Sequence, residues 1–334
     1  MNNEANHYSS LDLLRGISGY GVAVSHYFAF LHGNQKFEYI SFLFVEFFFI
    51  LSGYVLFPQL IKVFNNKKNL IYFYVRRWLR TIPLYTLCLL MISLIFDKIF
   101  SLDFFKYLFF LQDIKPNFLD EAYYPIVWSL SIEEFFYIIF PIILILIRRD
   151  LAAKLIILLA LIIITKFFII DSIDLKFFRT GTFIRFDAIL VGFLCRYFIE
   201  KIDKKFFLLI FSIILLFIFL SAENYFLGNK SISYVKMSLI FLMQILSILF
   251  VYLFISFEET ILIKKIQKFS SLVSKQTYSV YLTHMIFIYV FLNFKMQSWI
   301  EFIFYIISLF ATSTFLYYFI EDPILKRRPK LKYD

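Results

Sequence analysis

The sequence is poor in the residues on which soluble and disulfide-bonded proteins depend. Only 17% of its 334 residues are charged, and it contains eight glycines, seven prolines and two cysteines. Cys88 and Cys195 both fall in apolar stretches, which argues against a disulfide framework and against a thiolate metal site. Few glycines and prolines leave little linker sequence, and no block of about 100 residues has the polarity of a soluble domain.

Apolar and aromatic residues fill the chain instead. Hydrophobic residues make up 61% of it, including 48 phenylalanines and 23 tyrosines, and the mean hydropathy is +0.78. Such a composition is typical of a membrane protein, and phenylalanine and tyrosine suit lipid-facing surfaces and interfacial belts. We therefore predict a single transmembrane domain over residues 1–334.

Apolar runs of about 20 residues predict an all-α polytopic membrane protein with about ten transmembrane helices. Most of the 34 lysines and arginines fall in alternate loops, so the positive-inside rule places those loops and both termini in the cytoplasm. The same rule accounts for the net charge of +10, which therefore does not indicate nucleic-acid binding. The predicted spans are 13–32, 39–60, 82–100, 123–147, 152–171, 181–200, 205–222, 234–256, 277–294 and 298–320.

A histidine and an arginine lie in the first apolar stretch, where ionisable side chains are costly and usually face a partner or a water-filled cavity. Arg15 and His26 are eleven residues apart, a helical rotation of about 1100° that places both on one face. The helical rise separates them by roughly 16 Å, about half of a hydrocarbon core about 30 Å thick. The pattern predicts Arg15 at the cytoplasmic surface and His26 near the midplane as an acid–base group.

The fourth span carries a carboxylate at a matching depth. Glu133 enters from the outer side and would lie roughly 8–12 Å below that surface. We expect Glu133 and His26 to meet in one cavity, where the carboxylate orients the imidazole or stabilises its charged form. Tyr137 lies one turn further along and shares the face of Glu133. The alternative is that Glu133 only satisfies polar groups between helices.

Three arginines precede the third span on the predicted cytoplasmic side. The spacing of Arg76, Arg77 and Arg80 lets their guanidinium groups converge, and such groups bind phosphates through paired, charge-assisted hydrogen bonds. The cluster is either an ordinary positive-inside loop that binds lipid head groups or a docking site for a phosphorylated donor. Its position at the mouth of a cavity that holds a histidine favours the docking site.

A second histidine and a charged pair also occupy apolar spans. His284 lies roughly 11 Å from the cytoplasmic side and is a second candidate for proton transfer or donor contact. Helix packing through Ser279 and Thr283 is the alternative. Arg185 and Asp187 are close enough in sequence to neutralise each other. No Walker-type loop, dinucleotide-binding loop or His-Glu-x-x-His helix occurs, so we expect no metal.

Several motifs follow one another along essentially the whole chain. They are Leu11-Asp12-x-Leu14-Arg15-Gly16 with His26, Phe48-Phe49-x-x-Ser52-Gly53-Tyr54-Val55-Leu56, Arg76-Arg77-x-x-Arg80 with Pro83 and Tyr85, Trp128-Ser129-Leu130-Ser131-x-Glu133-x-x-Phe136-Tyr137 with Pro141, Ser279-x-Tyr281-Leu282-x-His284, and Glu321-x-Pro323. In this order they resemble the acyltransferase-3 family of integral membrane acyltransferases. The motif around Trp128 is the most specific.

The resemblance implies roughly ten transmembrane helices, acetyl-CoA as the cytoplasmic donor and an O-acetylated carbohydrate as the product on the far side. It makes His26 the essential catalytic histidine and Arg15 and Glu133 further essential polar groups. It also gives Arg77 and Arg80 a part in holding the phosphates of CoA. The chain ends just after the tenth span. It therefore resembles the stand-alone members of the bacterial cytoplasmic (inner) membrane, which modify lipopolysaccharide O-antigen, exopolysaccharide or similar glycans.

We therefore expect an O-acetyltransferase, surrounded by membrane lipids, that uses acetyl-CoA and a lipid-linked or surface glycan. His26 would act as the general base or carry the acetyl group briefly, and Arg15 or Tyr137 would stabilise the developing oxyanion. The outer segments 101–122 and 221–236 are expected to select the acceptor. The alternative is a transporter or flippase whose intramembrane histidine and glutamate relay protons or bind solute, although no internal repeat is evident.

Overall fold

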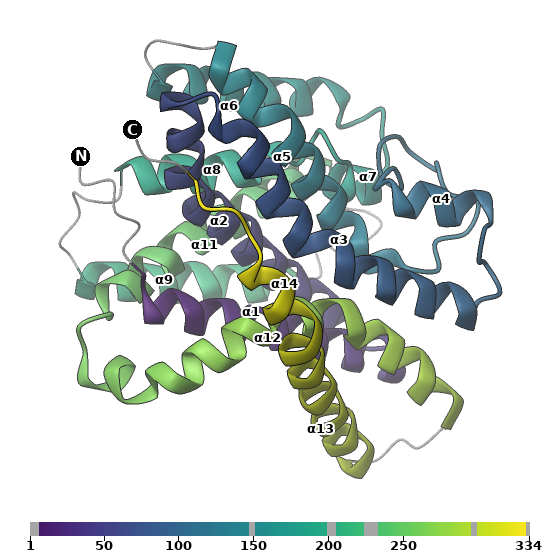
Figure 1. Ribbon diagram of the computed structural model, residues 1–334. Coiled ribbons are helices and arrows are strands. Elements are labelled where there is room, and N and C mark those ends of the chain that lie inside the picture. Colours follow the sequence, from purple (N-terminus) through teal and green to yellow (C-terminus); the bar gives the residue numbers. More distant parts are fainter. Residues whose placement is uncertain (1–6, 147–150, 199–204, 224–232, 295–298, 332–334) are drawn as a thin grey trace.

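The computed structural model describes residues 7–146, 151–198, 205–223, 233–294 and 299–331, and in these residues it contains helices and loops but no strand (Figure 1). The longer helices are α1 (Ser9–His32), α2 (Gln35–Asn65), α3 (Asn69–Ile95), α5 (Trp128–Leu146), α6 (Leu151–Ile169), α8 (Phe186–Phe198), α9 (Lys205–Ser221), α11 (Ser233–Ser256), α12 (Ile261–Phe294) and α13 (Trp299–Leu316). The shorter elements are α4 (Leu102–Leu108), η1 (Pro125–Val127), α7 (Leu175–Thr180), η3 (Tyr317–Glu321) and α14 (Asp322–Lys326).

Each of the ten predicted apolar stretches overlaps one of the longer helices. Among the described residues six helical segments are long and apolar enough to cross a membrane, which confirms the all-α polytopic class, while the number of about ten transmembrane helices stays a prediction. The six are Gln35–Asn65, Asn69–Ile95, Pro125–Leu146, Leu151–Ile169, Val235–Ser256 and Trp299–Lys326. The ends of the predicted spans 123–147, 181–200 and 298–320, and most of the expected acceptor segment 221–236, lie outside the described residues.

Two helices extend well beyond their predicted spans. α3 already begins at Asn69, so the three arginines lie on this helix rather than in a loop. α12 begins at Ile261 and runs through Lys264, Lys265 and Lys268 before it reaches the apolar segment. Lysine is a good helix former, but hydropathy reports only where a helix meets lipid. Hydropathy therefore underestimates the length of helices that continue into water.

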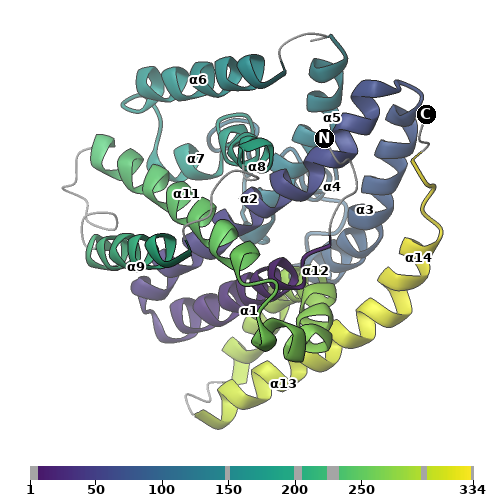
Figure 2. The same cartoon turned by 90° about the vertical axis from the view of Figure 1, so that its left-hand side faces the viewer.

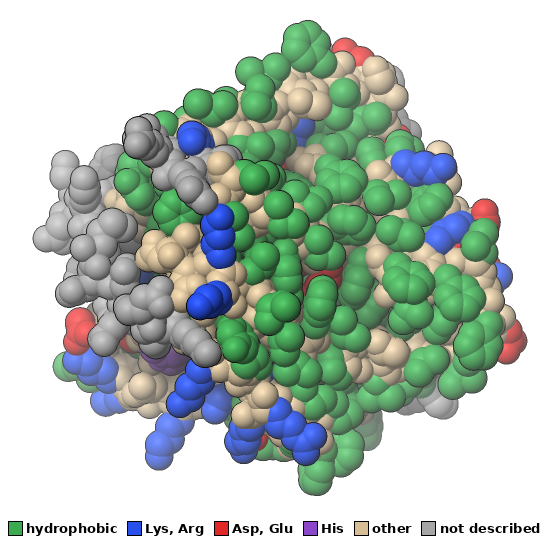
Figure 3. Space-filling view, turned by 45° about the horizontal axis from the view of Figure 1, so that its top comes forward, with side chains coloured by type: hydrophobic (Ala, Val, Ile, Leu, Met, Phe, Trp, Pro, Cys, Tyr) green, Lys and Arg blue, Asp and Glu red, His purple; other side chains and the backbone are tan. Residues whose placement is uncertain are grey.

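Apolar side chains cover much of the outside of the bundle. Figure 3 shows one face on which hydrophobic side chains predominate, with lysine and arginine side chains gathered along its lower edge. α6 and α13 lie at the periphery (Figure 2), and Phe168 and Trp299 on these helices are 82% and 75% exposed. A contiguous apolar surface of this extent is unfavourable in water and favourable in lipid. The surface therefore supports a position within the bilayer.

α1 and α12 pack against each other along most of the length of α1 (Figures 1 and 2). A Cβ atom at Gly16 would overlap the side chain of Val273, and one at Gly19 would contact Thr277. The same register places His26 beside His284, 258 residues further along the chain. Residues that contact each other follow the same order and nearly the same spacing along α1 and α12. The two helices therefore run parallel. Small residues in α1 permit this close approach.

A second close approach joins α2 and α8. A Cβ atom at Gly53 would overlap the carbonyl oxygen of Ile189, and one at Gly192 would overlap that of Ile50. Each glycine therefore faces the backbone of the other helix, where no rotamer change relieves a clash. The contact holds α8 against the helix that carries Ser52 and Gln59 of the site described below.

The predicted Arg185–Asp187 pair is wrong. Arg185 pairs with Glu46 of α2, and Asp187 pairs with Lys166 of α6 and accepts a hydrogen bond from Gln244 of α11. Arg185 and Asp187 are only two residues apart and point to different neighbours, since side chains at that spacing do not share a helix face. All four charged groups are buried. The ion pairs therefore join α8 and the turn before it to α2 and α6.

The start of α1 is held by a glutamate from the loop after α11. The Glu258 carboxylate accepts hydrogen bonds from the backbone N–H groups of Ser9 and Ser10, at 2.9 and 2.7 Å. N–H groups in the first turn of a helix have no carbonyl acceptor within the helix, so they need a partner from outside it. Burial of the carboxylate acts to raise its pKa, but the hydrogen bonds from Ser10 and Ser9 outweigh it and leave the pKa of Glu258 below its ordinary value.

We predict that Gly53→Ala destabilises the protein by about 1–3 kcal/mol, because the added methyl group pushes α2 and α8 apart. Gly21→Ala is the matched control, since its Cβ would meet only the ring of Phe44, which can rotate. The thermal unfolding midpoint in detergent measures the effect. Equal midpoints for the two variants would contradict the tight α2–α8 contact.

We also predict that Glu258 stabilises the fold above its ordinary pKa of about 4.3 and loses this effect as the pH falls through its lowered folded value. Glu258→Gln should lower the unfolding midpoint at neutral pH, and its difference from wild type should shrink in acid. Glu259→Gln, at a neighbouring carboxylate that is 83% exposed, is the control. A difference that does not change with pH would argue against the cap.

Candidate functional site

His26 and His284 form a pair inside the bundle. His26 Nδ1 lies 3.0 Å from His284 Nε2, and the two rings stack with their centroids 5.2 Å apart. His284 Nδ1 lies 3.2 Å from the carbonyl oxygen of Val280. A carbonyl only accepts, so this contact assigns the proton of neutral His284 to Nδ1 and leaves Nε2 to accept from His26 Nδ1–H. The basic nitrogen of the pair is then Nε2 of His26.

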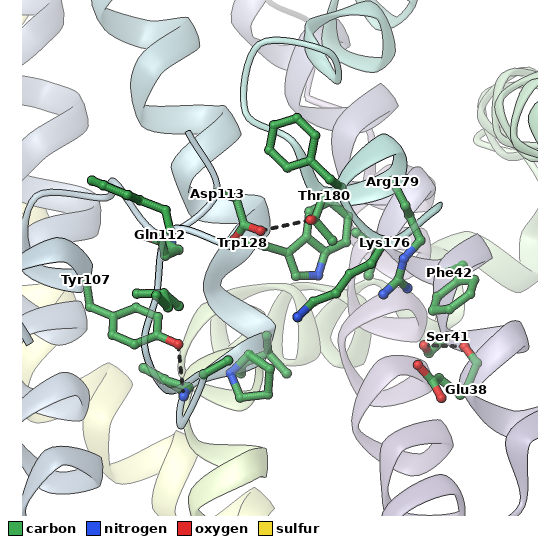
Figure 4. Close-up of a pocket in the computed structure, with 18 of the residues that line it drawn as sticks. Glu38, Ser41, Phe42, Tyr107, Gln112, Asp113, Trp128, Lys176, Arg179 and Thr180 are labelled. Atoms are coloured by element: carbon green, nitrogen blue, oxygen red, sulfur yellow. Dashed lines mark hydrogen bonds between the residues drawn. The ribbon is translucent and has the colours of Figure 1, made fainter. Parts of the chain in front are cut away.

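His26 lines a cavity of about 1070 Å³, open space at its mouth included, formed by the end of α1, the start of α2, the loop after α4, and α7. The lining is polar and aromatic. Figure 4 shows Lys176, Arg179 and Trp128 grouped across from Gln112 and Tyr107. The segment 101–122, expected to select the acceptor, supplies Gln112, Asp113, Lys115 and neighbouring residues to this wall. We call it the histidine cavity.

A second cavity of about 1020 Å³, open space at its mouth included, lies toward the other end of α1. Five arginines line it, and they come from α1, α3 and the C-terminal segment: Arg15, Arg76, Arg77, Arg80 and Arg328. The sequence-predicted arginines do converge, and Arg15 joins them. We call this the arginine cavity.

The arginines differ in how far they are already engaged. Arg76 donates to the carbonyl oxygen of Pro329 at 2.7 Å, and Arg77 donates to Gln59 at 2.6 Å. Arg77 also lies over the Tyr137 ring, 5.3 Å from its centroid. Among the described residues, no hydrogen bond or ion pair joins the guanidinium groups of Arg15, Arg80 and Arg328 to a protein partner. These three are therefore the groups most available to an anionic ligand.

Glu133 and Tyr137 lie in the arginine cavity and not beside His26. Glu133 accepts hydrogen bonds from Ser52 and Tyr137, both at 2.8 Å. The expectation that Glu133 and His26 share one cavity is therefore wrong. Matching depth places two groups in the same layer of the membrane, but it does not determine which helices are neighbours. The partner of His26 is the other histidine.

Tyr281 lines both cavities. Its hydroxyl group donates to the carbonyl oxygen of Ile126 at 2.5 Å and lies 2.6 Å from Ser129 Oγ. Its ring centroid is 5.8 Å from that of His284. The tyrosine therefore forms the wall that separates the arginine cavity from the histidine pair.

Three basic residues that line the two cavities were not identified as site residues from the sequence. Arg328 follows the last helix, and Lys176 and Arg179 lie on α7. The signal available for Lys176 and Arg179 was that they are basic residues on the predicted outer side, where few occur. Arg328 belongs to a basic tail and is indistinguishable there from its neighbours.

A π-helical turn, η3, follows directly after α13. Glu321 at the end of this turn accepts a hydrogen bond from Ser279 of α12. Single π-turns concentrate at functional sites because they re-aim side chains. Among the described residues no cluster of three or more His, Cys, Asp or Glu side chains could hold a metal ion.

Comparison with known proteins identifies relatives of matching sequence. The acyltransferase-3 family model, described as an acyltransferase domain, matches residues 8–319. The O-acetyltransferase OatA of Staphylococcus aureus (strain NCTC 8325 / PS 47) is 27% identical over 361 residues, which cover 95% of this chain and 57% of OatA. SACOL0978 of Staphylococcus aureus (strain COL) is 24% identical over 360 residues, with the same coverage.

The chain thus spans a little over half the length of these relatives. No solved structure matches it at a significant level. Because the family match extends over most of the sequence and includes every residue of the histidine pair and four of the five arginines, this chain belongs to the acyltransferase-3 family.

Proposed function

We propose that the protein is an O-acetyltransferase that moves an acetyl group from cytoplasmic acetyl-CoA to a hydroxyl group of an extracytoplasmic glycan. The observation that carries this proposal is the arrangement of two cavities on either side of Tyr281, one rich in arginine and the other reaching His26. The arginine-rich lining can bind a phosphorylated donor. The lining around His26 can bind a hydroxylated acceptor. The similarity to OatA, an O-acetyltransferase, supports the same reaction class.

The arginine cavity would hold the phosphates of CoA. Guanidinium groups bind phosphate through two parallel N–H donors, and Arg15 and Arg80 have such donors available. Glu133 is the single carboxylate among the residues of the arginine cavity. Its bonds to Ser52 and Tyr137 keep it close to the protein wall. The cavity therefore favours an anionic occupant with several negative charges.

The histidine pair would supply the base. His26 Nε2 accepts the proton of the acceptor hydroxyl group as the hydroxyl oxygen attacks the thioester carbonyl carbon. When the C–S bond breaks, the proton passes from the His26 imidazolium to the departing CoA thiolate. His284 fixes the tautomer of His26 and stabilises its charged form through the Nδ1–Nε2 contact, as a positioning residue. Transfer through an acetyl-imidazole on His26 uses the same geometry.

The proposal places the chain as one domain with about ten transmembrane helices, with both termini and the arginine cavity on the cytoplasmic side of a bacterial cytoplasmic membrane. Arg15 on the first helix and Arg328 after the last line the same cavity, which supports a common side for the two ends. The acceptor would be a lipid-linked or surface glycan that enters the histidine cavity from the opposite face.

We predict that detergent-solubilised protein binds CoA and that Arg80→Gln weakens binding about tenfold or more, since a charged hydrogen bond to phosphate is lost. Isothermal titration at two salt concentrations measures this, and the wild-type affinity should fall with salt. Lys264→Gln, an exposed cytoplasmic charge outside the cavity, should leave binding unchanged. Absence of CoA binding would contradict the transferase and favour the transporter.

We predict that His26→Ala lowers acetyl transfer by at least about 10²-fold, as loss of a general base does, while CoA affinity stays near that of wild type. Transfer of radiolabelled acetyl groups to membrane glycan in vesicles gives the readout. Full activity in His26→Ala would overturn the role of this histidine. A labelled acetyl-protein adduct that disappears in the variant would identify the covalent route.

A further inference from the structure

Arg179 is held at the edge of the histidine cavity by aromatic contacts. It lies near the end of α7, whose first turn is capped by Asp174, which accepts from Phe177 N–H at 2.7 Å. The Arg179 guanidinium carbon lies 3.7 Å from the centroid of the Phe42 ring and 5.6 Å from that of Trp128. In Figure 4 the Arg179 and Lys176 side chains both extend toward the same space between Trp128 and Phe42.

In the described part of the chain Arg179 forms no ion pair, although the carboxylates of Glu38 and Asp113 line the same cavity. Within the described residues no acidic oxygen comes within 4 Å of its guanidinium nitrogens, and no hydrogen bond joins them to another group. Asp113 is occupied by the hydroxyl group of Thr180, at 2.8 Å. The cavity holds three carboxylates and three cations in all, namely Glu38, Asp113, Asp174, Lys115, Lys176 and Arg179.

The cations that are fully buried between helices outside the two cavities are neutralised directly. Arg185 pairs with Glu46, and Lys166 pairs with Asp187. A cation removed from bulk water without a partner is expensive, and cation–π contacts recover only part of that cost. Arg179 departs from this pattern at a position that lines the cavity of the histidine pair. The N–H donors of the Arg179 guanidinium group are therefore oriented by the aromatic rings and remain available to a ligand.

We infer that the acceptor is an anionic saccharide whose carboxylate or phosphate group binds Arg179, with Lys176 as a second cation and the Trp128 ring against the sugar. This inference rests on the proposed function and names its substrate class. The bound anion would hold a neighbouring hydroxyl group toward His26, since Arg179 and His26 line one cavity and are close enough for their charges to interact.

The test uses three probes that share one methyl glycoside ring and differ only at C6: methyl β-glucoside, methyl β-glucuronide and methyl β-glucoside 6-phosphate. Binding to the purified full chain is followed by saturation-transfer NMR and titration, so that the readout does not depend on catalysis. We expect wild type to bind at least one anionic probe about tenfold more tightly than the glucoside. Preference for the glucuronide alone identifies a carboxylate, and preference for the phosphate alone identifies a phosphate.

Arg179→Gln should abolish that preference, and Arg179→Lys, which keeps the charge but loses the two-pronged geometry, should retain part of it. Lys36→Gln, on the same side of the protein but outside the cavity, should behave like wild type. Equal binding of the three probes, absence of anionic-probe binding, or an unchanged preference in Arg179→Gln would overturn the inference. CoA binding and unfolding midpoints of each variant, measured in parallel, separate this failure from failure of the proposed function or of the fold.

Discussion

Gly16 and Gly19 let the first helix lie so close to α12 that any larger side chain at either position would collide with Val273 or Thr277. Because the helices are parallel, the register set by these contacts continues along the pair and brings His26 within 3.0 Å of His284. Neither histidine alone defines a base with a fixed tautomer. The backbone carbonyl of Val280 assigns the proton on one ring, and that ring assigns the proton on the other. Helix packing in the N-terminal half of α1 therefore determines the chemistry near its C-terminal end.

Charges inside the bundle fall into two groups that differ in their partners. Cations that join helices, such as Arg185 and Lys166, are paired directly with carboxylates. Cations that line the two cavities are held by carbonyl oxygens, amides or aromatic rings, and several of their donors stay available. Removing one partner of a buried pair costs several kcal/mol, so the first group has a structural reason to be there. The second group has none, and a ligand with negative charge supplies one.

Sequence reasoning could predict the local features of this structure. Hydropathy and helical spacing are local properties, which is why the helices and the convergence of the arginines on α3 could be anticipated. Lateral neighbours depend on how distant helices pack. Glu133 and His26 were matched by depth, yet Glu133 bonds Ser52 and His26 bonds His284, 258 residues away. The cations of α7 could not be recognised as cavity residues, because their only local signal was an unexpected positive charge.

Tyr281 gives the two cavities their separate roles. Its hydroxyl group is tied to the η1 turn and to Ser129 at the start of α5, so the wall between the cavities is built from the same Trp128 motif that lines both of them. In the proposed reaction, a thioester bound among the arginines would reach His26 past this wall. While it is in place, the donor is kept from water in the histidine cavity, and excluding water suppresses hydrolysis of a reactive acyl group. In the proposed reaction the tyrosine would therefore keep the donor apart from the water of the histidine cavity, and the acceptor would approach His26 from the side of the cavity that Arg179 lines.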